Sequence, residues 1–131
     1  MSKETMARAQ DGFRAWQRGD FATIEAMLDP LVEWRWFEPG DWDCHSRKDV
    51  MNRLRQRSAE GFARGELEFL DAGDDRVIVV AHPAEIGGED WPSETATLIT
   101  FSQGKVTAMQ DYRTKQEALA AVPYGKGMAG G

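Results

Sequence analysis

The chain has 131 residues, of which 22 are acidic and 16 basic, so its formal net charge at pH 7 is −6. This length fits one domain, and the acidic balance argues against a nucleic-acid-binding protein, which needs clustered positive charge. A single cysteine excludes an internal disulfide and a multi-cysteine zinc site. No apolar run approaches the ~18 residues of a membrane span, and the N-terminus lacks the apolar core of a secretory signal. We therefore expect a cytoplasmic protein.

Two helices are predicted at the start of the chain. The first has an apolar face with helical spacing, made of Met6, Ala9, Phe13 and Trp16. Gly19 favours the end of this helix, and Asp20 can cap a second, shorter helix. The apolar face of the second helix would consist of Phe21, Ile24 and Leu28. Asp29-Pro30 is expected to end it.

A strand and a third helix follow. Residues 31–37 alternate with a period of two, which predicts a strand with one buried face. The side chains on that face are Val32, Trp34 and Trp36. Ser46-Arg-Lys-Asp49 has the capping-box pattern that opens a helix, which is expected to end at Gly65. The arginines of this helix are interpreted as a solvated face rather than a phosphate site: Arg53, Arg55, Arg57 and Arg64.

The second half of the chain is typical of a sheet. Four strands are predicted, at residues 67–69, 77–81, 95–101 and 105–113. Residues 77–81 form a continuous apolar run, which we expect to be covered on both faces. Gln103-Gly104 predicts a tight hairpin turn between the last two strands.

A second capping box and a tail complete the chain. Thr114-Lys-Gln-Glu117 is expected to open a short helix that reaches Val122. Residues 123–131 are rich in glycine and predict a flexible tail after a single domain of residues 1–122. Consecutive strands joined by hairpins imply an antiparallel sheet, and helices gathered early imply that they pack on one face of it. The predicted fold class is therefore α+β.

Several strings, in this order, resemble the SnoaL-like group of the nuclear transport factor 2-like superfamily over about residues 5–122. They are Gly19-Asp20-Phe21, Leu31-Val-Glu-Trp34, His45-Ser-Arg-Lys-Asp-Val50, Leu98-Ile-Thr-Phe-Ser-Gln-Gly-Lys-Val-Thr-Ala-Met-Gln-Asp-Tyr112 and Glu117-Ala-Leu119. The resemblance implies a cone-shaped, cystatin-like α+β barrel, in which a curved antiparallel sheet wraps around helices and leaves a pocket at its open end. It also implies a homodimer through the outer sheet face. The chemistry of the family ranges from polyketide cyclisation and steroid isomerisation to epoxide hydrolysis.

Asp111 is the candidate catalytic residue. It matches the position at which the polyketide cyclases and the limonene-type epoxide hydrolases carry an acid/base aspartate. A carboxylate buried among apolar groups has a raised pKa, which suits proton transfer near neutral pH. The alternative is a strand-end aspartate that is solvated or paired with Arg113 or Arg35.

The two histidines are the next candidates. His82 follows the apolar run and could assist Asp111 by moving a proton or by hydrogen bonding to a substrate oxygen. In the strand alternation His82 falls on the same face as Ile78 and Val80. Because both faces of that run are apolar, the sequence leaves open whether the His82 side chain points into the pocket. His45 could lie at the rim of the pocket or could only hydrogen-bond the start of the third helix. Beside Cys44 it makes a poor metal pair, and we predict no metal site.

Five tryptophans are many for a small acidic domain. An aromatic box for a flat apolar ligand could be built from Phe13, Trp16, Trp34, Trp36 and Met109. The alternative is that these side chains simply fill the core. Trp42 and Trp91 fall in polar loops, where they could close the mouth of a cavity or lie in an interface.

Two family mechanisms are disfavoured by the residues present. The resemblance places the base of the ketosteroid isomerases at Trp34, and Glu33 would reach that face only after a one-residue slip. The stretch that should carry the arginine and second aspartate of the epoxide hydrolases reads Val-Ile-Val-Val. We therefore predict a pocket for a small apolar or aromatic molecule, either with cofactor-independent acid–base chemistry at Asp111 or as a non-catalytic binding or dimeric interaction domain.

Overall fold

The computed structural model describes residues 2–37, 40, 43–59, 66–73, 75–83, 85, 88, 90 and 92–122. Their order is α1 (Ser2–Arg18), α2 (Phe21–Met27), β1 (Leu28–Arg35), α3 (Arg47–Ala59), β2 (Leu67–Asp71), β3 (Arg76–Ala81), β4 (Thr95–Ser102), β5 (Lys105–Tyr112) and α5 (Lys115–Ala121). The predicted tail at 123–131 and the predicted end of the third helix at Gly65 lie outside these ranges. Within them, no helix is long and apolar enough to cross a membrane.

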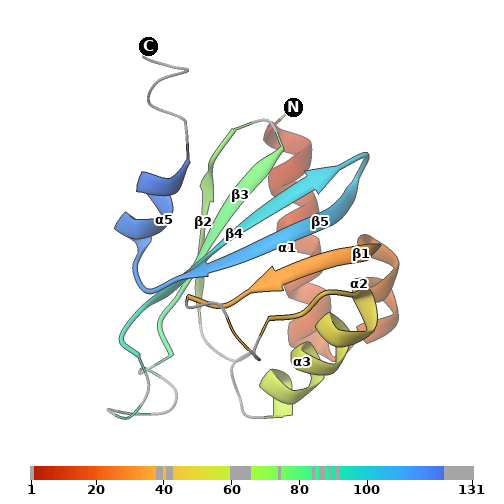
Figure 1. Cartoon of the computed structure of the whole chain (residues 1–131), viewed down its shortest axis with the longest axis horizontal. Coiled ribbons are helices and arrows are strands. Elements are labelled where there is room, and N and C mark those ends of the chain that lie inside the picture. The colour runs from red at the N-terminus through yellow and green to blue at the C-terminus, as the bar shows by residue number, and fades with distance from the viewer. Residues whose placement is uncertain are drawn as a thin grey trace.

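The five strands form one open sheet in the order β1-β5-β4-β3-β2 (Figure 1). Strands β2 to β5 pair antiparallel, as predicted. Strand β1 instead pairs parallel with β5, with Trp34 beside Met109, so the sheet is mixed. The expectation of a purely antiparallel sheet was wrong because it rested on hairpins, which join only strands that follow one another in the chain. The predicted single-domain α+β class is confirmed.

The inner face of the sheet carries the larger core, under α1, α2 and α3 (Figure 1). Alternation along the strands supplies Val32 and Val77 to this core, and α3 adds Val50 and Met51; all four are fully buried. The first helix crosses β2 and β3, which brings Phe13 within a ring-centroid distance of 5.8 Å of Phe69. The ends of β1 and β5 form part of the wall of a cavity under these helices.

The outer face of the sheet has a smaller core of its own, under α5 (Figure 1). It is formed by Ala72, Ile78, Val80, Ala96, Leu98, Ala118 and Val122. The predicted burial of residues 77–81 on both faces is therefore confirmed. The three early helices pack on one face, as predicted, and the short C-terminal helix α5 folds back over the other face.

The second helix ends earlier than predicted. Met27 is its last residue and β1 begins at Leu28, which has an extended backbone. Asp29 and Pro30 lie inside the strand, where a proline is tolerated because β1 is the edge strand. The predicted cap is present, since the Thr23 backbone N–H donates to Asp20 Oδ1 at 3.3 Å.

The cap side chain of both predicted capping boxes is in place, and in each box the carboxylate accepts from the residue before the cap. The Asp49 backbone N–H donates to Ser46 Oγ at 3.2 Å, which starts α3. The Glu117 backbone N–H donates to Thr114 Oγ1 at 3.1 Å, and Glu117 Oε1 accepts from the Arg113 N–H at 3.1 Å. These bonds satisfy backbone donors that a helix start otherwise leaves without a partner.

We expect Thr114→Ala to lower the free energy of unfolding by about 1 kcal/mol, because α5 loses its N-cap and with it part of the cover of the outer core. Urea denaturation followed by circular dichroism would measure the change. The matched control is Gln116→Ala, because Gln116 is exposed and lies in the first turn of the same helix. This substitution should be close to neutral. An equal effect of the two substitutions would contradict the assigned cap.

Candidate functional site

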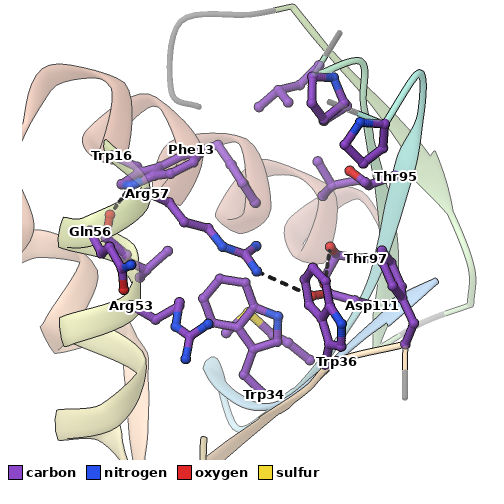
Figure 2. A pocket seen from close by; sticks show the side chains of 18 residues that line it. Phe13, Trp16, Trp34, Trp36, Arg53, Gln56, Arg57, Thr95, Thr97 and Asp111 are labelled. Carbon is purple, nitrogen blue, oxygen red and sulfur yellow. Dashed lines mark hydrogen bonds and ion pairs between the residues drawn. The ribbon is translucent and has the colours of Figure 1, made fainter. Parts of the chain in front are cut away.

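A cavity of about 300 Å³ lies between the helices and the inner face of the sheet (Figure 2). Its described walls are mainly apolar: Phe13, Trp16, Trp34, Trp36, Phe37, Leu54, Leu67, Val79, Ala81, Pro83, Pro92 and Met109. The polar lining residues are Arg53, Gln56, Arg57, Thr95, Thr97 and Asp111. The structure thus brings the predicted aromatic residues, Met109 and Asp111 around one space. That a ligand occupies it remains a prediction.

Trp34 is held from both sides of its strand. It lies beside Met109 of β5 on one side. On the other side its backbone N–H donates to the Cys44 carbonyl at 2.9 Å, and its carbonyl accepts from the Cys44 N–H at 2.8 Å. The indole is buried and points to the inner face, in line with Val32. Its orientation is therefore fixed by the backbone.

Trp36 extends the same face beyond the end of β1. Its backbone N–H donates to Asp43 Oδ1 at 2.9 Å, and its carbonyl accepts from Gln110 Nε2 at 3.0 Å. The indole packs against Phe37 at a ring-centroid distance of 4.2 Å. These contacts fix a second aromatic wall where regular strand pairing has stopped.

Trp16 belongs both to the core and to the cavity wall. Its Nε1 donates to the Leu54 carbonyl at 3.0 Å, which ties α1 to α3. Phe13, one turn earlier, meets it edge to face at a centroid distance of 5.9 Å. The two alternatives left open by the sequence, core filling and pocket lining, therefore both apply to this residue.

Asp111 is a buried carboxylate at the cavity wall, with 4% of its surface exposed. Its partner in the β4–β5 register is Thr97, whose hydroxyl donates to Asp111 Oδ1 at 2.7 Å. Burial raises the pKa of Asp111, although the Arg57 guanidinium and the Thr97 hydroxyl each act to lower it. Loss of hydration is thus the dominant influence on this group.

Arg57 extends from α3 across the cavity toward Asp111 (Figure 2). Its Nη2 lies 3.8 Å from Asp111 Oδ2. Its Cζ is 4.6 Å from the centroid of the Trp34 ring and 5.4 Å from that of Trp36. The side chain is 20% exposed, so the cation is held by aromatic faces and an acidic partner.

The expectation that the arginines of α3 form a solvated face was wrong for Arg57 and for Arg53, which also lines the cavity. It holds for Arg55, which is exposed, and Arg64 lies outside the described residues. A signal was present: Arg57 follows Val50 by seven positions and Leu54 by three, so the three share one helical face.

The alternative partners named for Asp111 were wrong, and so was the alternative of a solvated side chain. Arg35 bonds to Glu33 Oε1 at 3.1 Å and holds the pKa of Glu33 below its ordinary value. The Arg113 guanidinium lies 5.2 Å from the centre of the Phe37 ring. Glu33 is partly exposed and lies on the other face of β1. The strand is therefore not shifted by the one residue that would bring Glu33 to the position of an isomerase base.

Two buried polar atoms at this site have no hydrogen-bond partner among the described residues. They are Trp34 Nε1 and Asp111 Oδ2. The Trp34 N–H lies close enough to act on Asp111 and helps to lower its pKa, but its geometry falls short of a hydrogen bond. Buried polar atoms are normally paired, and these two lie near one another at the polar end of the cavity, both closed off from solvent.

Neither histidine lines the cavity in the part of the chain that the structure describes. His82 Nδ1 lies 3.4 Å from the Ser93 carbonyl. The His45 side chain is 64% exposed, with Nδ1 at 3.6 Å from Glu33 Oε2. We assign neither a role in the chemistry. Trp42 and Trp91 lie outside the described residues, and within them no group of three or more His, Cys, Asp or Glu could hold a metal ion.

Solved structures share this architecture. An NTF2-like protein from Cytophaga hutchinsonii has a TM-score of 0.62 at 11% identity, over 82% of this chain and 88% of that one. One from Burkholderia xenovorans has a TM-score of 0.61 at 23% identity, over 93% and 97%. A protein from Xanthomonas campestris, proposed to be a polyketide cyclase, has a TM-score of 0.61 at 19% identity, over 92% and 97%.

The chain has the NTF2-like fold. The superfamily resemblance seen in the sequence is confirmed at the level of the fold. No family model and no curated protein matches the chain. A structural likeness at less than 25% sequence identity establishes the fold and not the activity. The function therefore has to be argued from the site.

The raised pKa of Asp111 predicts how stability depends on pH. In the unfolded chain Asp111 loses its proton near the ordinary value of 3.8, whereas the folded protein retains it to higher pH. The folded state is therefore favoured below about pH 3.8, and this contribution is lost as the pH rises through the raised pKa. The side chain of the Asp111→Asn variant cannot ionise, so its stability lacks this pH-dependent contribution.

We expect the free energy of unfolding of the wild-type protein, relative to that of Asp111→Asn, to fall as the pH rises from about 4 to about 8. Urea denaturation of both proteins across this range measures the difference, in which the other titrating groups cancel. A difference that is constant or rises with pH would mean that burial is not the dominant influence on the pKa of Asp111.

Proposed function

We propose that this NTF2-like protein binds a small, flat, apolar molecule and transfers a proton at a carbon next to a carbonyl, with Asp111 as the base and without a cofactor. The observation that carries the proposal is the buried Asp111 carboxylate, which lines an apolar cavity and lies beside the Arg57 guanidinium. The cavity volume of about 300 Å³ is at the lower end of small-molecule sites, which favours a ligand of one or two rings.

The proposed step uses groups that meet at one end of the cavity. The Asp111 carboxylate takes the proton from the carbon next to the carbonyl and becomes a carboxylic acid. The electron pair of the broken C–H bond forms a C=C bond, and the carbonyl π pair moves to the oxygen. Arg57 and the Trp34 N–H are the donors available to stabilise this oxyanion. They take the place of His82, which was predicted to assist.

The local environment supports this division of roles. The pKa of Asp111 is raised toward neutral pH, which makes its carboxylate a stronger base than that of an exposed aspartate. Thr97 holds Oδ1, which leaves Oδ2 on the side of Arg57. Proposed polyketide cyclases from Xanthomonas campestris and Sinorhizobium meliloti have a similar fold, and acid–base chemistry on carbonyl compounds suits such a class.

A non-catalytic ligand-binding or dimeric interaction domain is the competing proposal. Its support is that Asp111 already accepts a hydrogen bond from Thr97 and has a cationic neighbour, as a structural carboxylate does. In that case the cavity would bind its ligand without proton transfer. The outer sheet face, expected to form a homodimer, is partly covered by α5, which reduces the sheet surface open to a partner.

Exchange of deuterium into a ketone tests the catalytic proposal directly. We expect the protein to accelerate exchange of the protons next to the carbonyl of 2-tetralone, a bicyclic aromatic ketone, in D₂O. Asp111→Asn should lower the protein-dependent rate by about 10²–10⁴-fold, because the amide cannot act as the base. Proton NMR measures the rate after subtraction of the buffer reaction.

Thr95→Val is the matched control for this experiment. Thr95 also lines the cavity but makes no contact with the carboxylate that the structure records. It should therefore retain far more activity than Asp111→Asn. Binding of 2-tetralone with no accelerated exchange would support the non-catalytic alternative and remove the proposed chemistry.

Substitution of Arg57 should change both the rate and its pH dependence. The positive charge of Arg57 lowers the pKa of Asp111. Arg57→Gln should therefore move the rising limb of the pH–rate profile to higher pH, and it should slow exchange through loss of a donor to the oxyanion. The profile of 2-tetralone exchange, compared with wild type, measures both effects. A slower rate with an unmoved profile would mean that Arg57 does not act on Asp111.

A further inference from the structure

A second cavity, of about 60 Å³, lies under α1 and α2 on the inner face of the sheet. Strands β4 and β5 supply part of its wall with Ile99, Phe101 and Val106, and α2 supplies Ile24. Every described lining residue other than Arg8 is apolar. The interior of this cavity therefore offers no side chain that could hydrogen-bond a guest.

The size and polarity of the second cavity restrict what can fill it. A single water needs roughly 10–15 Å³ of cavity volume and two or more polar partners, whereas dry apolar cavities bind apolar molecules. A cavity of about 60 Å³ has room for about four groups of water or methylene size, which is less than the six atoms of an aromatic ring. The interior thus favours a short alkyl chain over water and over a ring.

The second cavity opens beside two cations. Arg8 lines it and is exposed, and a Cβ at Gly104 in the β4–β5 hairpin would lie 3.2 Å from Arg8 Cζ. Lys105 follows Gly104, and its Nζ donates to the Ala26 carbonyl at 2.6 Å, next to the lining residue Met27. Both positive charges therefore lie at the edge where the hairpin meets α1 and α2.

The positive charge of Arg8 is not neutralised locally. No hydrogen bond or ion pair of Arg8 is recorded with any residue that the structure describes, and this includes Glu4, one turn earlier on α1. Glu25 of α2 lines a different groove, between α2 and α3. The mouth of the second cavity is thus complementary to an anionic head group.

We propose that the second cavity binds a short aliphatic carboxylate of five or six carbons. Its alkyl chain fills the cavity, and its carboxylate lies beside Arg8 and Lys105. The apolar walls select the chain, the volume limits its length, and the two cations select the head group. This inference is independent of the proposed proton transfer, because neither Asp111 nor Arg57 lines the second cavity.

The chain length is tested on the wild-type protein with butanoate, hexanoate and octanoate, in titrations followed by ¹H–¹⁵N NMR. We expect hexanoate to bind about tenfold more tightly than butanoate, because two more methylene groups leave water. Octanoate should gain no more than about a further twofold, because its added carbons do not fit. The backbone amides of Ala9 and Gly12 should shift. An affinity that keeps rising by the same factor to octanoate, or shifts confined to the first cavity, would overturn the proposal.

Two leucine substitutions locate the bound chain. Ala9→Leu adds three carbons at the wall of the second cavity, and Ala81→Leu adds the same three at the wall of the first. Ala9→Leu should weaken hexanoate binding at least about tenfold and retain the fold, because the added carbons fill existing space. Ala81→Leu should retain the affinity within about twofold. The reverse result would assign hexanoate to the first cavity and refute the second site.

The head group is tested by comparing hexanoate with hexylammonium at low ionic strength. The wild-type protein should bind hexanoate at least about threefold more tightly, and Arg8→Gln should remove most of this preference. Arg14→Gln is the matched control, since Arg14 is an exposed arginine of the same helix and already pairs with Asp11 at 3.2 Å. It should leave the preference unchanged. Equal binding of the two ligands by the wild-type protein, or an equal effect of the two substitutions, would exclude recognition of the carboxylate by Arg8.

Discussion

The polar end of the cavity is organised around one buried carboxylate, that of Asp111. Taking an ionised group out of water is costly unless donors and opposite charge replace its hydration. Thr97 supplies one hydrogen bond and Arg57 supplies positive charge, yet the pKa of Asp111 is still raised. Burial therefore exceeds the compensation that the described residues provide. The remaining acceptor capacity is at Oδ2, the oxygen on the side of Arg57.

The same constraint explains why an arginine crosses a cavity with apolar walls. A guanidinium is more weakly hydrated than an ammonium and stacks on aromatic faces, so it can be brought next to a buried acid at a smaller cost. Trp34 and Trp36 hold Arg57 in that place, and Arg57 in turn lowers the pKa of Asp111. The excess of tryptophan and the charge pair are thus parts of one arrangement, in which aromatic side chains position a cation.

Features that depend on residues close in sequence could be predicted from the residues alone, whereas the gathering of distant aromatic residues and Asp111 around one cavity was expected largely from the family resemblance. The Thr114 cap and the Gln103-Gly104 turn, in which both residues have positive φ angles, follow from local hydrogen bonds and backbone freedom. The parallel pairing of β1 with β5 joins the two ends of the domain and leaves no local signal. The spacing of Arg57 placed it on the apolar face of its helix, but not opposite Asp111, because that meeting depends on how α3 lies over the sheet.

Trp34 is a position at which this chain departs from one of the mechanisms that the superfamily resemblance suggested. The resemblance places the carboxylate base of the ketosteroid isomerases at this position, and an indole N–H can donate but cannot take up a proton. The only buried carboxylate among the described residues is on the neighbouring strand, at Asp111, two positions beyond the partner of Trp34 in the β1–β5 register. The donor is thus on β1 and the acceptor on β5. A carbonyl bound here would therefore turn its oxygen toward β1 and α3, and the carbon that loses a proton toward β5.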